Sequence, residues 1–192
     1  MGIIHINKKK KSSIIRYVNE ANMILSYDVQ NIICSYIYDL REVINFYNLS
    51  KKHQNCIYIT DLCNRNSKYL QKITQKVLKQ QKFKYIEKLN ASYNKYIYNV
   101  NHLKNTLKVL YCAYDSGIDQ KGISDVKLQY LNANFNTKIK NVNHMKHTLE
   151  ILFCIYDCGI DQKGISELNL KKLDCYKNEK IINNQNMNDD SY

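Results

Sequence analysis

The octapeptide Gly117-Ile118-Asp119-Gln120-Lys121-Gly122-Ile123-Ser124 returns unchanged as Gly159-Ile160-Asp161-Gln162-Lys163-Gly164-Ile165-Ser166, 42 residues further along the chain (159 minus 117). The same register holds outside the octapeptide, because the pair Asn101-His102 returns as Asn143-His144. Identity over such a fixed distance indicates an internal repeat, and repeats of this length are typical of solenoid proteins.

A shorter period, the step from Leu89 to Leu110, divides the longer one into two equal halves. Its central positions are Leu89, Leu110, Leu131, Leu152 and Leu173. Leu or Ile stands three positions before each central leucine, Ala or Cys two positions after it, Asn or Asp five positions after it, and Ile eight positions after it. This pattern and its period are typical of a leucine-rich repeat.

The repeated residues have a physical reason to recur. Two apolar residues at a spacing of two face the same side of a short strand, the Asn or Asp can hydrogen-bond backbone at the turn, and the later Ile returns to the core. We expect the repeat core to contain Leu89, Leu110, Cys112, Leu131, Leu152, Cys154 and Leu173. At about 1.5–3 kcal/mol per fully buried leucine, about five stacked coils can support one core.

The octapeptide also resembles a phosphate-binding loop, since Gly117 and Gly122 have the spacing of its two glycines. Ile123 stands where that loop needs its lysine, so the cation that would meet the phosphates is missing. We therefore predict a structural return in which Ile118 and Ile123 enter the core and Gly122 permits a tight turn.

Composition sets broad limits on function. The 192 residues carry a net charge of +12 and include neither Pro nor Trp. A basic surface can give non-specific affinity for nucleic acid, but no run of basic and aromatic residues follows one element, so we expect no nucleic-acid partner.

The seven cysteines form no C-x-x-C pair. With no signal peptide and no apolar stretch of membrane length, we expect a cytoplasmic or nuclear protein without a membrane partner.

The chain divides into five parts. We expect a flexible basic arm over residues 1–13, a helical module over 14–58, a helical linker or N-terminal cap of the repeats over 59–83, leucine-rich repeats over 84–182 and a disordered tail over 183–192. In the module, apolar residues at helical spacing follow Asp28 and Asp39, which predicts two short helices with these aspartates as N-terminal caps. Residues 59–62 could instead open a degenerate first coil, although Lys68 stands where the repeat frame needs a leucine.

Part of the helical module resembles an F-box. The matching stretch is Leu25-Ser26-Tyr27-Asp28-Val29-Gln30-Asn31-Ile32-Ile33-Cys34-Ser35-Tyr36-Ile37, and residues 49–51 resemble the end of that motif. Ser26 stands where the F-box has Pro, and Gln30 stands where it has an apolar residue. The resemblance implies contact with a Skp-type adaptor through Leu25, Val29, Ile33, Tyr36, Ile37, Val43 and Leu49.

The repeats resemble the cysteine-containing leucine-rich repeats that follow many F-boxes, with Leu152, Cys154, Ile160, Gly164 and Ile165 in comparable places. The whole arrangement also resembles uncharacterised repeat proteins of giant amoeba-infecting DNA viruses. The resemblance implies the substrate-recognition subunit of a cullin-RING ubiquitin ligase, which would be the host's enzyme, in the host cytoplasm, if the protein is viral. The fold class is then α/β, a short leucine-rich-repeat solenoid preceded by a small α-helical F-box-like module.

Residues with catalytic chemistry do not form a set. His102 and His144 are equivalent in the repeat and His147 lies nearby, but a metal would need further converging ligands. Cys158 lacks a base that the sequence places beside it. We expect no catalytic residues, no metal and no cofactor.

A binding surface is the remaining expectation. Residues on either side of each central leucine face away from the core of a leucine-rich repeat, along its concave sheet. We predict that a protein target binds Val109, Tyr111, Tyr130, Asn132, Ile151, Phe153, Asp174 and Tyr176. The protein would be a monomeric adaptor; a repeat scaffold with no ubiquitin link and a basic nucleic-acid binder are the two alternatives.

Overall fold

The computed structural model describes residues 39–48, 58–63 and 70–182 of the chain. The chain forms two compact units, residues 1–57 and residues 58–192. The predicted arm and tail, and the F-box-like positions Leu25, Val29, Ile33, Tyr36, Ile37 and Leu49, lie outside the described residues.

The described part of the first unit is one helix, α3 (Leu40–Tyr47). It begins where the sequence predicts the second helix of the module. The carboxylate of Asp39 accepts the backbone N–H of Arg41 at 2.8 Å, as an N-terminal cap does. Leu40, Val43 and Tyr47 are buried, at helical spacing along one face.

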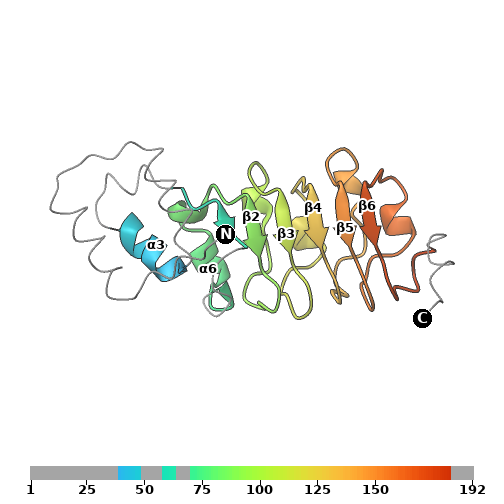
Figure 1. Ribbon diagram of the computed structural model, residues 1–192, viewed down its shortest axis with the longest axis horizontal. Helices are drawn as coiled ribbons and strands as arrows, with labels where there is room; N and C mark the ends of the chain where they lie inside the picture. The colour runs from blue at the N-terminus through green and yellow to red at the C-terminus, as the bar shows by residue number, and fades with distance from the viewer. Residues whose placement is uncertain (1–38, 49–57, 64–69, 183–192) are drawn as a thin grey trace, which may run out of the picture. The chain divides into compact units, whose positions relative to one another are not determined.

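The second unit is a solenoid whose strands form one parallel sheet in chain order (Figure 1). Its strands are β1 (Asp61–Leu62), β2 (Lys88–Asn90), β3 (Val109–Tyr111), β4 (Tyr130–Asn132), β5 (Ile151–Phe153) and β6 (Lys172–Asp174). Its helices are α6 (Gln75–Leu78) and the 3-10 turns η1 (Gln81–Phe83), η2 (Asn101–Leu103), η3 (Lys121–Ile123), η4 (Asn143–Met145) and η5 (Lys163–Ile165). The predicted leucine-rich-repeat solenoid is confirmed.

The central leucines form one row across the sheet. Leu89 pairs with Leu110, and the same pairing continues strand by strand to Leu173. Leu89, Leu110, Cys112, Leu131, Leu152 and Cys154 are fully buried. Leu173 is only half-buried, in the last strand of the described sheet, where no further described coil covers it. Each coil thus buries its leucine against the next coil.

The sheet has one strand more than the five predicted from the repeat. Strand β1 pairs with β2 and places Leu62 beside Leu89. The connection between these two leucines is longer than one repeat period, because α6 and η1 both lie in it. The prediction of a helical linker over residues 59–83 was therefore incomplete, since the segment also supplies a strand. Because this connection is longer than one period, the central leucine of the first coil is Leu62 and does not stand at position 68, one period before Leu89.

Asparagines are buried in every second coil. Asn94, Asn136 and Asn178 are at most 4% exposed. The Nδ2 of Asn136 donates to the carbonyl oxygens of Cys112 and Ile118, and its Oδ1 accepts the N–H of Lys138. Each buried amide thereby satisfies backbone groups of the preceding coil as well as its own turn.

The alternate coils bury a different residue at this turn. Asp115 and Asp157, which the sequence aligns with the buried asparagines, are exposed. The residues after them, Ser116 and Cys158, are buried instead. The predicted role at the turn was therefore wrong for the two aspartates: a carboxylate is too costly to bury without a cation, so a small neutral side chain takes the inner place.

The glycines of the octapeptide are needed for close packing between coils. A Cβ on Gly117 would lie 2.5 Å from the carbonyl oxygen of Lys95, and a Cβ on Gly122 would lie closer still to that of Tyr98. No glycine that the structure describes has a positive φ. Gly122 lies in the 3-10 turn η3, but this turn needs no positive φ. Glycine is needed there because it lets one coil approach the backbone of the coil before it. Ile118 and Ile123 are fully buried.

Polar side chains fasten neighbouring coils on the 3-10 side. The Oε1 of Gln120 accepts the N–H groups of Lys140 and Asn141, both at 2.9 Å, and its Nε2 donates to the carbonyl of Asn141. Gln75 makes the same three bonds to residues 98 and 99, and Gln162 accepts the N–H of Ile182. We call this contact the glutamine staple.

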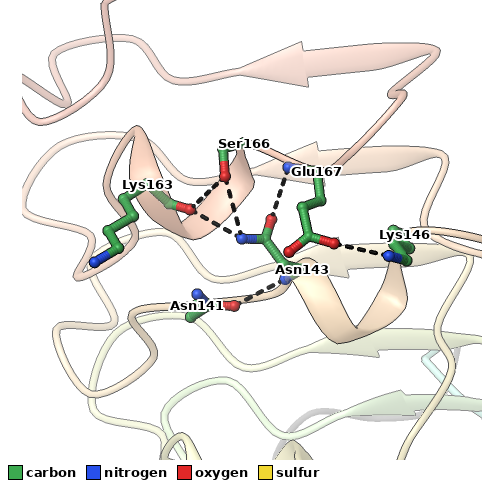
Figure 2. A network of polar contacts seen from close by, with 6 residues as sticks. All are labelled: Asn141, Asn143, Lys146, Lys163, Ser166 and Glu167. Carbon is green, nitrogen blue, oxygen red and sulfur yellow. Dashed lines mark hydrogen bonds and ion pairs between the residues drawn. The ribbon is translucent and has the colours of Figure 1, made fainter.

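In the coils that alternate with those of the glutamine staples, an asparagine makes the contact with the next coil, and we call this contact the asparagine staple. The Nδ2 of Asn143 donates to the carbonyl of Lys163 and to Ser166, and its Oδ1 accepts the N–H of Glu167 (Figure 2). Asn101, the equivalent residue two coils earlier, makes the same bonds to Lys121, Ser124 and Asp125. Glutamine and asparagine staples alternate along the array. Within the octapeptide, Gln120 therefore bonds to the following coil, while Lys121 and Ser124 accept bonds from Asn101 of the preceding coil.

Candidate binding face

The outer face of the sheet carries the side chains that flank the central leucines. Side chains alternate across a strand, so these residues point away from the core. Seven of the eight predicted contact residues are on strands: Val109 and Tyr111 on β3, Tyr130 and Asn132 on β4, Ile151 and Phe153 on β5, and Asp174 on β6. Tyr176 lies two residues after the end of β6. The first seven are half-buried and Tyr176 is 53% exposed.

Three of these residues form a row of rings across the middle of the outer face, which we call the face row. The ring centroids of Tyr111 and Tyr130 are 5.0 Å apart, and those of Tyr130 and Phe153 are 5.6 Å apart. The interplanar angles are 40° and 38°, so the rings are tilted and not stacked. Each ring therefore keeps part of its face toward solvent.

Tyr130 is the centre of the face row. Burial raises the pKa of its phenol, and a side-chain hydrogen bond with Tyr111 raises it further. The phenol therefore stays neutral at physiological pH and can donate or accept a hydrogen bond. An apolar ring with a neutral polar tip is the kind of side chain that anchors protein interfaces.

A second row of rings follows the end of the strands, four positions after each central leucine; we call it the ladder. Its members are Tyr93, Tyr114, Phe135 and Tyr156, with φ between 55° and 58°. Successive ring centroids are 4.3, 4.9 and 4.6 Å apart, with interplanar angles of 13–15°. A left-handed backbone destabilises the fold by roughly 1–2 kcal/mol per residue. Stacking of the rings stabilises it by about 0.5–1.5 kcal/mol per pair and so offsets part of this strain.

The ladder was not predicted from the sequence. The signal was present, because an aromatic residue stands at the same place in four successive coils. Nothing in the side chains themselves indicates a positive φ, which aromatic residues rarely adopt.

Charged residues occupy the two ends of the outer face. At the β1 end, the ammonium of Lys88 lies 4.0 Å from the carboxylate of Asp61. At the β6 end, Lys172 lies over the ring of Phe153, with its Nζ 5.2 Å from the centroid. Lys177 lies over Tyr176 and Tyr156, at 5.1 and 5.7 Å. The middle of the face is uncharged and mostly apolar, with the amide of Asn132 between Tyr111 and Phe153, and its ends are charged.

The cysteines with raised pKa values in the solenoid do not offer a nucleophile. Cys112, Cys154 and Cys158 are buried, and burial raises the pKa of each thiol. Cys63 is half-buried beside the outer face, and burial followed by the charge of Asp61 raises its pKa to about 12. Thiols with such pKa values stay protonated and unreactive at neutral pH.

Histidines and acidic residues remain scattered. Burial lowers the pKa of His102, whose ring bonds to backbone at Leu78, while His144 bonds to the carbonyl of Ile123. Within residues 39–48, 58–63 and 70–182, no three potential metal ligands come together. The helices in this part of the chain are too short or too polar to cross a membrane.

Comparison with protein-family models, with curated proteins and with solved structures gave no significant match for this chain.

Proposed function

We propose that the protein is a non-enzymatic, monomeric adaptor that holds a protein target on the outer face of its solenoid. The observation that carries this proposal is the face row of Tyr111, Tyr130 and Phe153, half-buried and continuous over three strands. Val109 and Ile151 extend the apolar surface beside it. Aromatic centres with polar margins are characteristic of protein interfaces.

The F-box-like segment supports a finer proposal, in which the adaptor recruits its target to a cullin-RING ubiquitin ligase through a Skp-type subunit. The support is the sequence match over residues 25–37 and 49–51. Val43, one of the residues assigned to the adaptor contact, is buried. We therefore assign Val43 to packing and leave the contact to the other six residues, which are Leu25, Val29, Ile33, Tyr36, Ile37 and Leu49.

Affinity purification separates the two levels of the proposal. We expect the full chain to recover a target, and we expect the double variant Tyr130→Ala/Phe153→Ala to lose it. The matched control is Tyr96→Ala/Tyr98→Ala, which removes two aromatic side chains that are 52% and 57% exposed outside the face row. Equal recovery by both double variants would exclude the outer face as the target site.

A separate variant tests the proposed link to a ubiquitin ligase. Ile33→Lys places a charge in the F-box-like segment and should abolish recovery of Skp-type subunits while the target is still recovered. If the intact chain never recovers such subunits but keeps its target, the protein is a repeat scaffold with no ubiquitin connection.

The net charge of +12 supports a second alternative, a nucleic-acid binder. Binding to phosphates releases counterions, so that function requires retention on DNA or RNA that falls steeply with salt. Retention that is weak and independent of salt would exclude it.

A further inference from the structure

Both rows of rings end in a lysine at the same end of the solenoid. Lys172 of β6 lies over Phe153, the last ring of the face row. Lys177 stands at the ladder position of the last coil and lies over Tyr156, the last ring of the ladder. The two ammonium groups therefore mark the β6 end of the apolar surface.

These two lysines differ from those along the sides of the sheet. Lys88, Lys108 and Lys171 pair with Asp61, Glu87 and Glu150 of the preceding coils at 4.0, 3.2 and 2.9 Å. Within the described residues, neither Lys172 nor Lys177 has a carboxylate at ion-pair distance. An aromatic ring attracts an ammonium group through its quadrupole but supplies no counter-charge. Both positive charges are exposed and available to an anion.

The two acidic residues of the last described coil, Asp174 and Glu179, form no ion pair with these lysines. The Oδ1 of Asp174 accepts the backbone N–H of Tyr176 at 3.2 Å, which holds this carboxylate at the turn after β6. Residues 171–182 hold four lysines against these two acidic residues, which leaves the β6 end positive. The β1 end differs, because Asp61 lies beside Lys88.

We propose that the outer face binds an acidic peptide segment in one direction. Its apolar side chains lie on the face row, and its carboxylates reach Lys172 and Lys177 at the β6 end. The inference rests on the proposed function, and adds the chemistry and the orientation of the partner. Charge complementarity of this kind fixes the register of a segment on an apolar surface.

The surface fits a peptide better than a single-stranded nucleic acid. A nucleic acid needs cations along its whole path and ring faces on which bases can stack. The middle of the outer face offers Val109, Tyr130 and Ile151 in successive coils, with no cation among them. The rings of the ladder are stacked on one another, so their edges and not their faces meet solvent.

Selection from a phage library of random dodecapeptides tests the proposal with the full chain. We expect the selected peptides to combine Phe, Leu or Ile with Asp or Glu toward one end. The same selection on the charge-reversal variant Lys172→Glu/Lys177→Glu should lose the acidic preference and gain Lys or Arg. Peptides without acidic enrichment, or an unchanged preference in the variant, would overturn the inference.

Affinity of one selected peptide gives the quantitative test, by fluorescence anisotropy. We expect the charge-reversal variant to bind about tenfold more weakly, since two exposed ion pairs are lost. The control is Lys104→Glu/Lys127→Glu, which changes the net charge equally at exposed positions outside the outer face and should leave the affinity within about twofold. A circular-dichroism melting curve of each variant shows that the solenoid is intact.

The outcomes separate the inference from the function on which it rests. If Tyr130→Ala/Phe153→Ala abolishes peptide binding and charge reversal leaves it unchanged, the outer face is the binding site and the acidic preference is wrong. If neither double variant affects the selected peptides, the site itself is wrong. If a uridine homopolymer displaces the peptide and binds more tightly, the partner is a nucleic acid and the inference fails.

Discussion

The Nδ2 of Asn136 donates a hydrogen bond to the carbonyl oxygen of Cys112 at 2.8 Å, in the interior between two coils. The residue at the same repeat position in the preceding coil, Asp115, is exposed. One position of the repeat therefore has two structural roles that alternate along the array.

We expect Asn136→Ala to lower the free energy of unfolding by about 1–3 kcal/mol, because buried carbonyl groups of Cys112 and Ile118 lose their donor. Asp115→Ala, at the equivalent exposed position, should change it by less than about 0.5 kcal/mol. Urea denaturation followed by circular dichroism measures both. Equal losses would show that the alternation has no energetic consequence.

We expect Gly122→Ala to destabilise the solenoid by roughly 1–3 kcal/mol, because the added methyl group overlaps the carbonyl oxygen of Tyr98 and forces two coils apart. Gly164 has the same contact with Lys140, so Gly164→Ala should behave alike. The neighbouring exposed Lys121→Ala serves as control and should be nearly neutral. A stabilising Gly122→Ala would contradict close packing, since alanine is otherwise favoured over glycine.

The ladder position should prefer glycine to alanine once the ring is removed. Phe135 has a φ of 58°, so Phe135→Gly relieves backbone strain that Phe135→Ala retains. We expect the glycine variant to be more stable than the alanine variant by about 1 kcal/mol, with both less stable than the native protein. Val109, on strand β3, is the matched control, and there the alanine variant should be the more stable of the two. The same order at both positions would show that φ does not decide the preference.

Alkylation of Cys63 should be slow until the pH is far above neutral. Its folded pKa is about 12 against 9.0 for a free thiol, so near pH 8 the thiolate fraction is about a thousandfold lower than in the unfolded chain. The sign follows from burial and the charge of Asp61, which both favour the protonated thiol.

Asp61→Asn removes that charge while it keeps an oxygen for the N–H of Cys63, and it should speed alkylation at pH 9. Mass spectrometry of the labelled peptide at several pH values measures the rate. Lys88→Ala should slow the reaction, because the lysine charge lowers the pKa of this thiol. Slower alkylation of Asp61→Asn together with faster alkylation of Lys88→Ala would show that these charges do not control Cys63.

The regular part of the fold could be predicted because each coil repeats the same contacts. Leu89 and its equivalents recur at one fixed period, and all lie in one register across the sheet. The first coil was predicted only as an alternative, with residues 59–62 opening a degenerate coil, because its connection is longer by a helix and a fixed period cannot show a strand that lies out of phase. Leu62 is buried like the other leucines, but only its pairing with Leu89 reveals its place.

The candidate site was predicted in part for the same reason. The strand alternation places Tyr111, Tyr130 and Phe153 on one face, and their positions in the structure follow from it. The cations over the rings at the β6 end could not be predicted, because the directions of long lysine side chains depend on contacts and not on spacing. The choice of Ser116 over Asp115 for the interior also depends on packing that the repeat pattern does not encode.

Because the two kinds of staple alternate, coils can be inserted or deleted in this protein only in pairs and not singly. Removal of one coil that contains Asn101, residues 85–105, would bring the glutamine connection of Gln75 next to that of Gln120, with no asparagine connection between them. Removal or duplication of two successive coils together keeps every donor opposite its acceptor. The identical octapeptides therefore mark the positions at which the chain can be lengthened by pairs of coils, each pair adding two strands to the outer face without altering the ends.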